Sequence, residues 1–191
     1  VVGQLCRRGR GPGEMVSSTV NFEMQAGRLF AYDFYRGEYN EVDVLASLSQ
    51  NSTIRTRSVK LEELPGKSML CVHPLPGDEL LLFDSASSLW TSALTHTPCF
   101  SVFDLSTGEH KRDMHVFKNI PQKESRRIRI LPQQILAFHD CIDDKRKTLC
   151  FVQNCFPQVN YLNVKTGDVF GIRLMMDGAA AFSPDRVIYH F

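Results

Sequence analysis

The residues most suggestive of a ligand site lie in the stretch CRRGRGPGEM, between Cys6 and Met15. Arg7, Arg8 and Arg10 stand among glycines there, a combination that can present guanidinium groups and backbone amides to an anion. It is not a phosphate-binding P-loop, because such a loop ends in Lys and Ser/Thr at a helix N-terminus, whereas Glu14 and Met15 follow here. A dinucleotide-binding fingerprint would likewise need a helix after it.

Two interpretations of this stretch remain. The first is an anion-binding site formed by Arg7, Arg8, Arg10 and the loop amides. The second, which the glycine content favours, is a structural corner where the chain turns. In it we expect Pro12 to fix one dihedral angle and the glycines to adopt positive φ, at Gly9, Gly11 and Gly13.

A second candidate is the acidic segment HDCIDD at 139–144. Asp140, Asp143 and Asp144 supply the oxygen ligands that calcium prefers. The glycine-punctuated spacing of a dedicated calcium loop is missing, and DDKRK brings in three cations. A charged hairpin turn is therefore the favoured interpretation, with a metal site as the alternative.

Trp90 is the single tryptophan and lies in the polar segment SSLWTSAL. It is predicted either to cap neighbouring strands or to offer a stacking surface to a ligand. The nearby serines lack the Gly-x-Ser-x-Gly elbow of a hydrolase nucleophile, so no catalytic residue and no cofactor are predicted.

Six cysteines are spread along the chain, and none forms a pair with a two-residue gap. Such a gap is typical of zinc and redox motifs. Because several of them lie in apolar strings, as in TLCFVQ, buried free thiols are favoured over disulfides or metal ligands. The even number alone does not decide between these states.

The composition argues against nucleic-acid binding and against a membrane-spanning segment. The chain has 191 residues, 43% of them hydrophobic, and a formal net charge of +1. No basic field favours nucleic acid, and the one basic run, KESRRIRI at 123–130, contains no aromatic side chain for base stacking. No apolar run approaches the roughly 20 residues that span a bilayer.

Short apolar runs separated by turn residues predict an all-β chain. Strands are expected at 28–34, 40–48, 52–61, 68–75, 79–85, 99–105, 111–117, 133–140, 147–153, 159–164, 168–174 and 185–191. Only EVDVLASLSQ and SASSLWTSAL have helix-compatible spacing.

The strands repeat. The segment FDLSTGEHKRDMHVF from Phe103 resembles LNVKTGDVFGIRL from Leu162, with their Thr-Gly turns 59 residues apart, and the segment from Val44 resembles a degenerate copy. Such units stack to bury their faces, as the four-stranded blades of a β-propeller do. We expect one propeller domain over 1–191, with about 3.5–4 blades, incomplete at one or both ends.

The segment Gly9–Glu14, GRGPGE, followed by a strand ending in AYDF, resembles the TolB-like six-bladed propeller proteins of Bacteroides-type bacteria. FSVFDLSTGE and YLNVKTGDVFGI are similar to hairpins of that family. The resemblance implies a cell-envelope location, periplasmic or lipid-anchored, and carries over no catalytic residue.

Two functional interpretations therefore remain. The favoured one is a non-catalytic binding or scaffolding propeller whose partner is a protein, a glycan or a small ligand. The alternative is a propeller enzyme, a metal-dependent lyase or hydrolase acting on sugars or lactones in the central funnel. A stoichiometric divalent ion held by residues from several blades would favour the enzyme.

Overall fold

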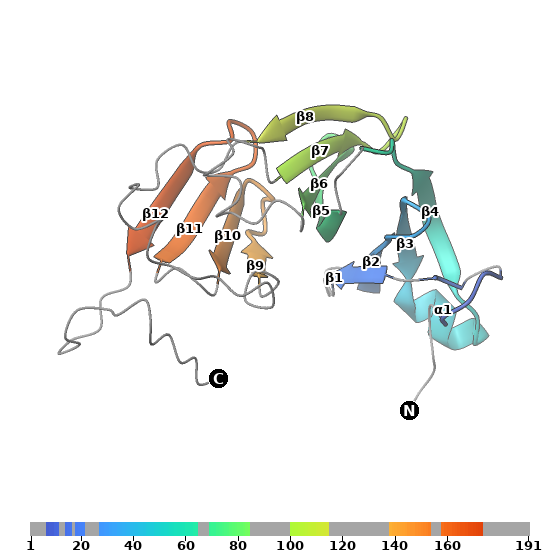
Figure 1. The fold of residues 1–191 in the computed structure, drawn as a ribbon. Helices are drawn as coiled ribbons and strands as arrows, with labels where there is room; N and C mark the ends of the chain where they lie inside the picture. The colour runs from blue at the N-terminus through green and yellow to red at the C-terminus, as the bar shows by residue number, and fades with distance from the viewer. Residues whose placement is uncertain are drawn as a thin grey trace, which may run out of the picture. The chain divides into compact units, whose positions relative to one another are not determined.

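The computed structural model describes residues 7–11, 14–16, 18–21, 27–64, 69–84, 100–114, 138–153 and 158–173. Their regular structure is almost entirely antiparallel β, in three four-stranded sheets (Figure 1). The chain divides into two compact units, Val1–Ala86 with Phe100–Asp113, and Ser87–Cys99 with Met114–Phe191. The first unit holds the first two sheets, and the second unit holds the third.

The first sheet is a meander of strands β1 (Ser18–Asn21), β2 (Arg28–Asp33), β3 (Glu38–Asp43) and β4 (Ile54–Lys60). Residues of β2 and β3 are buried almost throughout, whereas β4 alternates between half-buried and exposed positions. The sheet therefore has a buried centre and, in β4, a polar edge carrying charged side chains that discourage pairing with another chain.

A short helix, α1 (Val44–Gln50), connects β3 to β4. Its N-cap is Asp43, whose carboxylate accepts a hydrogen bond from the Ala46 amide at 2.8 Å. The helix ends at Asn51 in the left-handed region, with φ of 49°, a conformation that Asn tolerates better than most residues. The strand predicted over 40–48 is thus wrong in its second half, because the cap at Asp43 ends the strand and starts the helix.

The second sheet has the same order, with β5 (Met69–Leu75), β6 (Glu79–Asp84), β7 (Phe100–Asp104) and β8 (His110–Met114). Its central strands carry side chains buried on both faces, such as Leu80, Leu81 and Leu82. A strand with apolar residues on both faces must be covered on both sides.

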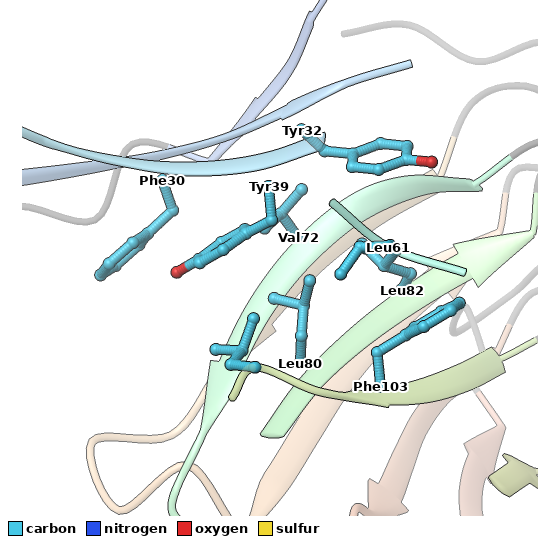
Figure 2. Packing of buried hydrophobic residues seen from close by; sticks show 9 residues of the cluster. Phe30, Tyr32, Tyr39, Leu61, Val72, Leu80, Leu82 and Phe103 are labelled. Carbon is cyan, nitrogen blue, oxygen red and sulfur yellow. The ribbon is translucent and has the colours of Figure 1, made fainter. Parts of the chain in front are cut away.

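Nine buried side chains form the core between the first two sheets (Figure 2). Phe30 and Tyr39 point from the first sheet toward the strands of the second, which contribute Val72 and Leu80. The other members are Tyr32, Leu61, Leu82, Phe103 and Leu105. Full burial of an aliphatic or aromatic side chain contributes about 1.5–3 kcal/mol, so this cluster is the main apolar link between the two sheets.

The segment that follows β4 also joins these sheets through its backbone. The Leu61 amide donates to the Gly37 carbonyl at 2.9 Å, and the Glu62 amide donates to the Gly108 carbonyl at 2.8 Å. The Glu62 carboxylate accepts from the His110 amide at 2.7 Å. The two sheets are therefore held by backbone contacts as well as by the apolar core.

The third sheet consists of β9 (Phe138–Ile142), β10 (Thr148–Gln153), β11 (Gln158–Asn163) and β12 (Val169–Arg173), again paired in chain order. Leu149, Phe151 and Leu162 are buried, whereas Phe170 and Ile172 on β12 are 65% and 47% exposed. This sheet thus has a buried apolar row and an outer strand with accessible apolar side chains.

The Thr-Gly turns of the second and third sheets match atom by atom. Asp104 Oδ1 accepts from the Ser106 and Thr107 amides, and Asn163 Oδ1 accepts from the Lys165 and Thr166 amides. The glycine that closes each turn has a φ of 81° at Gly108 and 76° at Gly167. The predicted repeat is therefore present as hydrogen-bonded geometry.

A second repeat lies three residues before Asp104 and Asn163, and before the helix cap Asp43 in the first sheet. Asn40, Ser101 and Asn160 occupy it on β3, β7 and β11, and all are at most 1% exposed. Ser58 donates to Asn40 Oδ1 at 2.9 Å, and Ser101 donates to Asp113 at 2.6 Å. The third strand of each sheet thus carries a buried polar side chain, which in the first two is hydrogen-bonded to the fourth strand.

The predicted strands at 28–34, 52–61, 68–75, 79–85, 99–105, 111–117, 133–140, 147–153, 159–164 and 168–174 overlap observed ones. Strand β1 was not among them. The predicted strand at 185–191, the basic run at 123–130 and the helix-compatible segment around Trp90 lie outside the described residues.

Candidate binding surface

The arginine-rich loop is a turn closed by its own carboxylate. The Gly9 amide donates to the Met15 carbonyl at 3.0 Å, and the Met15 amide donates to the Arg7 carbonyl at 2.9 Å. Glu14 Oε2 accepts from the Gly11 amide at 2.7 Å, and Met15 is 3% exposed. Met15 therefore anchors the loop, and Glu14 supplies a negative charge inside it.

Gly9 and Gly11 of this loop lie close to the Glu14 carboxylate. Neither Gly9 nor Gly11 has a positive φ, so the expectation of positive φ at these two positions is wrong. A Cβ on Gly9 would instead lie 2.0 Å from Glu14 Oε2. A side chain at position 9 would therefore displace the Glu14 carboxylate from its contact with the Gly11 amide. Pro12 and Gly13 lie outside the described residues.

The loop is fixed to the first sheet through Asp33 and Arg36. Asp33 is 1% exposed, and its Oδ2 accepts from the Val16 amide at 2.9 Å. Its Oδ1 accepts from the amides of Tyr35 and Arg36 at 3.2 and 3.3 Å. The Arg36 side chain in turn donates to the Arg10 carbonyl at 2.9 Å. The buried Asp33 carboxylate and the Arg36 side chain together hold the loop against the β2–β3 hairpin.

That hairpin exposes two aromatic side chains at its tip. Tyr35 is 71% exposed and Phe34 is 37% exposed, and their ring centroids are 5.5 Å apart in an edge-to-face arrangement. Edge-to-face pairs stabilise one another, so the two rings form one exposed aromatic pair.

The arginines of the loop face solvent beside this hairpin. Arg7, Arg8 and Arg10 are exposed, while the acidic groups of the same two segments, Glu14 and Asp33, are engaged in the amide contacts above. We call this set the arginine–aromatic surface; it comprises Arg7, Arg8, Arg10, Phe34, Tyr35 and Arg36. Its outward charge is positive, and guanidinium groups bind carboxylates and phosphates through paired hydrogen bonds.

Sequence reasoning identified the three loop arginines and missed the hairpin residues. The strand predicted over 28–34 placed Phe34 inside the sheet, whereas β2 ends at Asp33. One signal in the sequence could have found the hairpin residues: Arg36-Gly37 directly follows Phe34 and Tyr35. Because Gly favours a turn, this pair predicts that the two aromatic residues lie at the tip of a hairpin.

The acidic segment at 139–144 covers the end of β9 and the start of the turn to β10. Asp143 Oδ1 accepts from the Lys147 and Thr148 amides at 2.6 and 2.8 Å, and the Thr148 amide is the main cause that holds the pKa of Asp143 below its ordinary value. Asp144 is exposed, and the side chain of Asp140 lies outside the described residues. Among the residues that the structure does describe, no group of three His, Cys, Asp or Glu could hold a metal.

The cysteines are only partly as expected. Cys141 and Cys150 are free thiols. Cys141 is exposed, so buried thiols are a wrong prediction at that position, and Cys150 is half-buried. Trp90 lies outside the described residues.

No family model and no curated protein sequence matches the chain. Among solved structures, the chain is similar to a member of the DUF4221 family from Bacteroides vulgatus, with 11% identity and a TM-score of 0.54 over 90% of this chain and 47% of that one. The fold is that of a β-propeller. The four-stranded meanders agree with this architecture.

Two further propeller-like matches are more distant. The β-propeller domain of Cps50 (Swd1) from Myceliophteria thermophila has 12% identity, a TM-score of 0.38 and coverage of 85% and 41%. A streptogramin B lyase has 9% identity, a TM-score of 0.42 and coverage of 84% and 41%. The chain spans half or less of the length of these three structures. No helix in the described part of the chain is long and apolar enough to cross a membrane.

Proposed function

We propose that this protein is a non-catalytic binding propeller of the cell envelope, periplasmic or lipid-anchored, and that its arginine–aromatic surface binds an acidic face of a partner protein. The observation that carries the proposal is Tyr35, 71% exposed on a hairpin fixed by a buried carboxylate. The envelope location rests on the sequence resemblance of residues 9–14 to TolB-like propeller proteins.

The composition of the surface supports a protein partner. It contains Tyr, Phe and Arg, three residue types that are enriched at protein–protein interfaces. Exposed Lys60, which donates to the Arg36 carbonyl, lies at its border. The Arg36 side chain is hydrogen-bonded to the Arg10 carbonyl before binding, which reduces the side-chain freedom that it loses on association. The arginines would attract an acidic partner and pair with its carboxylates.

A photo-crosslinking residue at position 35 tests the proposal in the native host. The matched control carries the same residue at Leu45, which is also 71% exposed but lies on helix α1. We expect a discrete adduct from position 35 and none from position 45. The adduct should weaken several-fold when Arg8 and Arg10 are changed to Glu, and in about 0.5 M salt, which screens exposed charges.

Equal adducts from both positions, or an adduct from position 35 that ignores both the arginine changes and salt, would refute the proposal. Recovery of the protein in the cytosolic fraction of the host would refute the envelope location alone.

A further inference from the structure

Two thiols face each other across the third sheet. Cys141 on β9 and Cys150 on β10 are directly opposite in the antiparallel register. The two side chains are hydrogen-bonded to one another, and the Tyr161 hydroxyl contacts Cys150 from β11 on the other side. Both thiols are free, one exposed and one half-buried.

The backbone geometry of such a pair suits a covalent bridge. Directly opposite residues in antiparallel strands have Cα atoms about 4.5 or 5.5 Å apart, depending on whether the pair is hydrogen-bonded. Disulfides span Cα separations of about 4.4–6.8 Å. The Cα separation of either kind of pair falls within that range. The Cβ atoms of opposite residues are about 4.5–5.5 Å apart and those of a disulfide about 3.5–4.5 Å, so closing the bridge requires rotation of the side chains and a small approach of the two strands.

The two thiols differ in access. Cys141 is exposed and open to a reagent in solution. Burial, followed by the neighbouring Cys141 thiol, raises the pKa of Cys150, so Cys150 stays protonated at neutral pH. Exchange requires a small disulfide to reach the attacking sulfur, and the exposed Cys141 is therefore the thiol expected to react first.

We propose that Cys141 and Cys150 form a redox-sensitive pair that closes into a cross-strand disulfide by exchange with a small disulfide such as oxidised glutathione. The Cys141 thiolate attacks one sulfur of the reagent, which forms a mixed disulfide and releases one glutathione thiolate. Cys150 then loses its proton to solvent and attacks the Cys141 sulfur, which releases the second glutathione thiolate. Two protein thiols are oxidised, one small disulfide is reduced to two thiols, and the released thiolates take up the two protons.

The bridge would join β9 to β10 on either side of the turn at Asp143–Lys147. It depends only on the third sheet and does not involve the arginine–aromatic surface, so it stands or falls independently of the proposed function. An oxidising compartment would favour the closed form and a reducing one the open form.

Oxidation of the whole folded protein tests the pair. The reduced protein, freed of reductant, is incubated with oxidised glutathione, alkylated and analysed by intact mass and peptide mapping. We expect two of the six thiols to be lost, with the peptides containing Cys141 and Cys150 linked. The Cys155→Ser variant removes the cysteine nearest to Cys150 in sequence and should give the same link.

The single variants test the order of reaction. Cys150→Ser should accumulate a mixed disulfide with glutathione on Cys141, because the second thiol is missing. Cys141→Ser should leave Cys150 unmodified over the same time. Free thiols at both positions in the oxidised wild-type protein, or a link between Cys150 and Cys155 in place of the expected one, would overturn the proposal.

Discussion

Single acidic and amide side chains determine the turns of this protein. Asp43 caps α1, and Asp104 and Asn163 cap the Thr-Gly turns at the same point of their sheets. Asp33 likewise accepts from backbone amides in the β2–β3 hairpin, and Glu14 accepts from the Gly11 amide in the arginine-rich loop. Such residues favour turns because their side chains accept hydrogen bonds from nearby backbone amides. Several carboxylates that could look catalytic in the sequence are therefore structural.

The difference between Asp104 and Asn163 predicts a pH dependence. Hydrogen bonds from Ser106, first from its side chain and then from its backbone, lower the pKa of Asp104 to about 2. A group whose pKa is lowered on folding stabilises the native state above its unfolded pKa, near 4, and loses that contribution as the pH falls toward 2. Asn163 makes the same turn without a titrating group.

We therefore expect Asp104→Asn to fold normally at neutral pH and to show a shallower loss of thermal stability between pH 4 and 2. Asn163→Asp should show a steeper loss in the same window. Some acid sensitivity should remain in Asp104→Asn, because hydrogen bonding to Arg112 lowers the pKa of Glu79 as well. Thermal unfolding followed by circular dichroism across this pH range measures the difference, and identical slopes for wild type and Asp104→Asn would contradict the assignment.

At the level of strands and turns, the sequence predicts what depends on local pattern. Short apolar runs bounded by turn residues predict most of the strands, and the Thr-Gly spacing predicts the repeated hairpin. The predicted strand runs past the end of β3 because Val44 and Leu45 continue an apolar run. The strand stops at Asp43, whose carboxylate accepts from the Ala46 amide and starts the helix. Strand β1 was missed because its short polar sequence, STVN, forms a strand only by pairing with β2.

The candidate surface could be predicted only in part for the same reason. Three arginines in a glycine-rich loop are visible in the sequence, but their neighbours depend on a contact between segments 26 residues apart, from Arg36 to the Arg10 carbonyl. Likewise, the pairing of Cys141 with Cys150 follows from the register of β9 and β10. Tertiary contacts of this kind leave no local pattern.

The turn between β7 and β8 illustrates how a hairpin is fitted to its neighbour. A Cβ on Gly108 would lie 2.0 Å from the Lys60 carbonyl oxygen, whereas a Cβ on Gly77 would meet nothing within 4 Å. Both glycines have a φ near 80°. The backbone strain of a substitution is thus similar at the two positions, and only Gly108 adds a steric conflict with the first sheet.

Gly77→Ala is accordingly expected to lower the free energy of unfolding by about 1 kcal/mol, the cost of a side chain in the left-handed region. Gly108→Ala should cost about 2–3 kcal/mol more, since the hairpin must move away from Lys60. Urea unfolding of both variants, with the wild type as reference, gives the comparison. Equal destabilisation would show that the hairpin does not need its close contact with the first sheet.

At the scale of the whole molecule, the first two sheets depend on each other. Stacked blades of a propeller cannot bury their apolar faces alone, and here Phe30 and Tyr39 of one sheet complete the core beneath Val72 and Leu80 of the next. The backbone contacts of Leu61 and Glu62 strengthen the same junction. A defect in this core should therefore loosen both sheets, although each has its own hydrogen bonds.

Leu80→Ala is the direct test of this dependence. Leu80 is fully buried in the shared core, and truncation of such a leucine costs about 2–5 kcal/mol. Hydrogen exchange followed by mass spectrometry should show faster exchange in β2 and β3 as well as in β5–β7. Phe170→Ala, at a position 65% exposed on β12, is the control and should change exchange little in these strands. If Leu80→Ala accelerates exchange in the second sheet alone, the two sheets unfold independently, and their junction contributes much less to stability than the buried cluster implies.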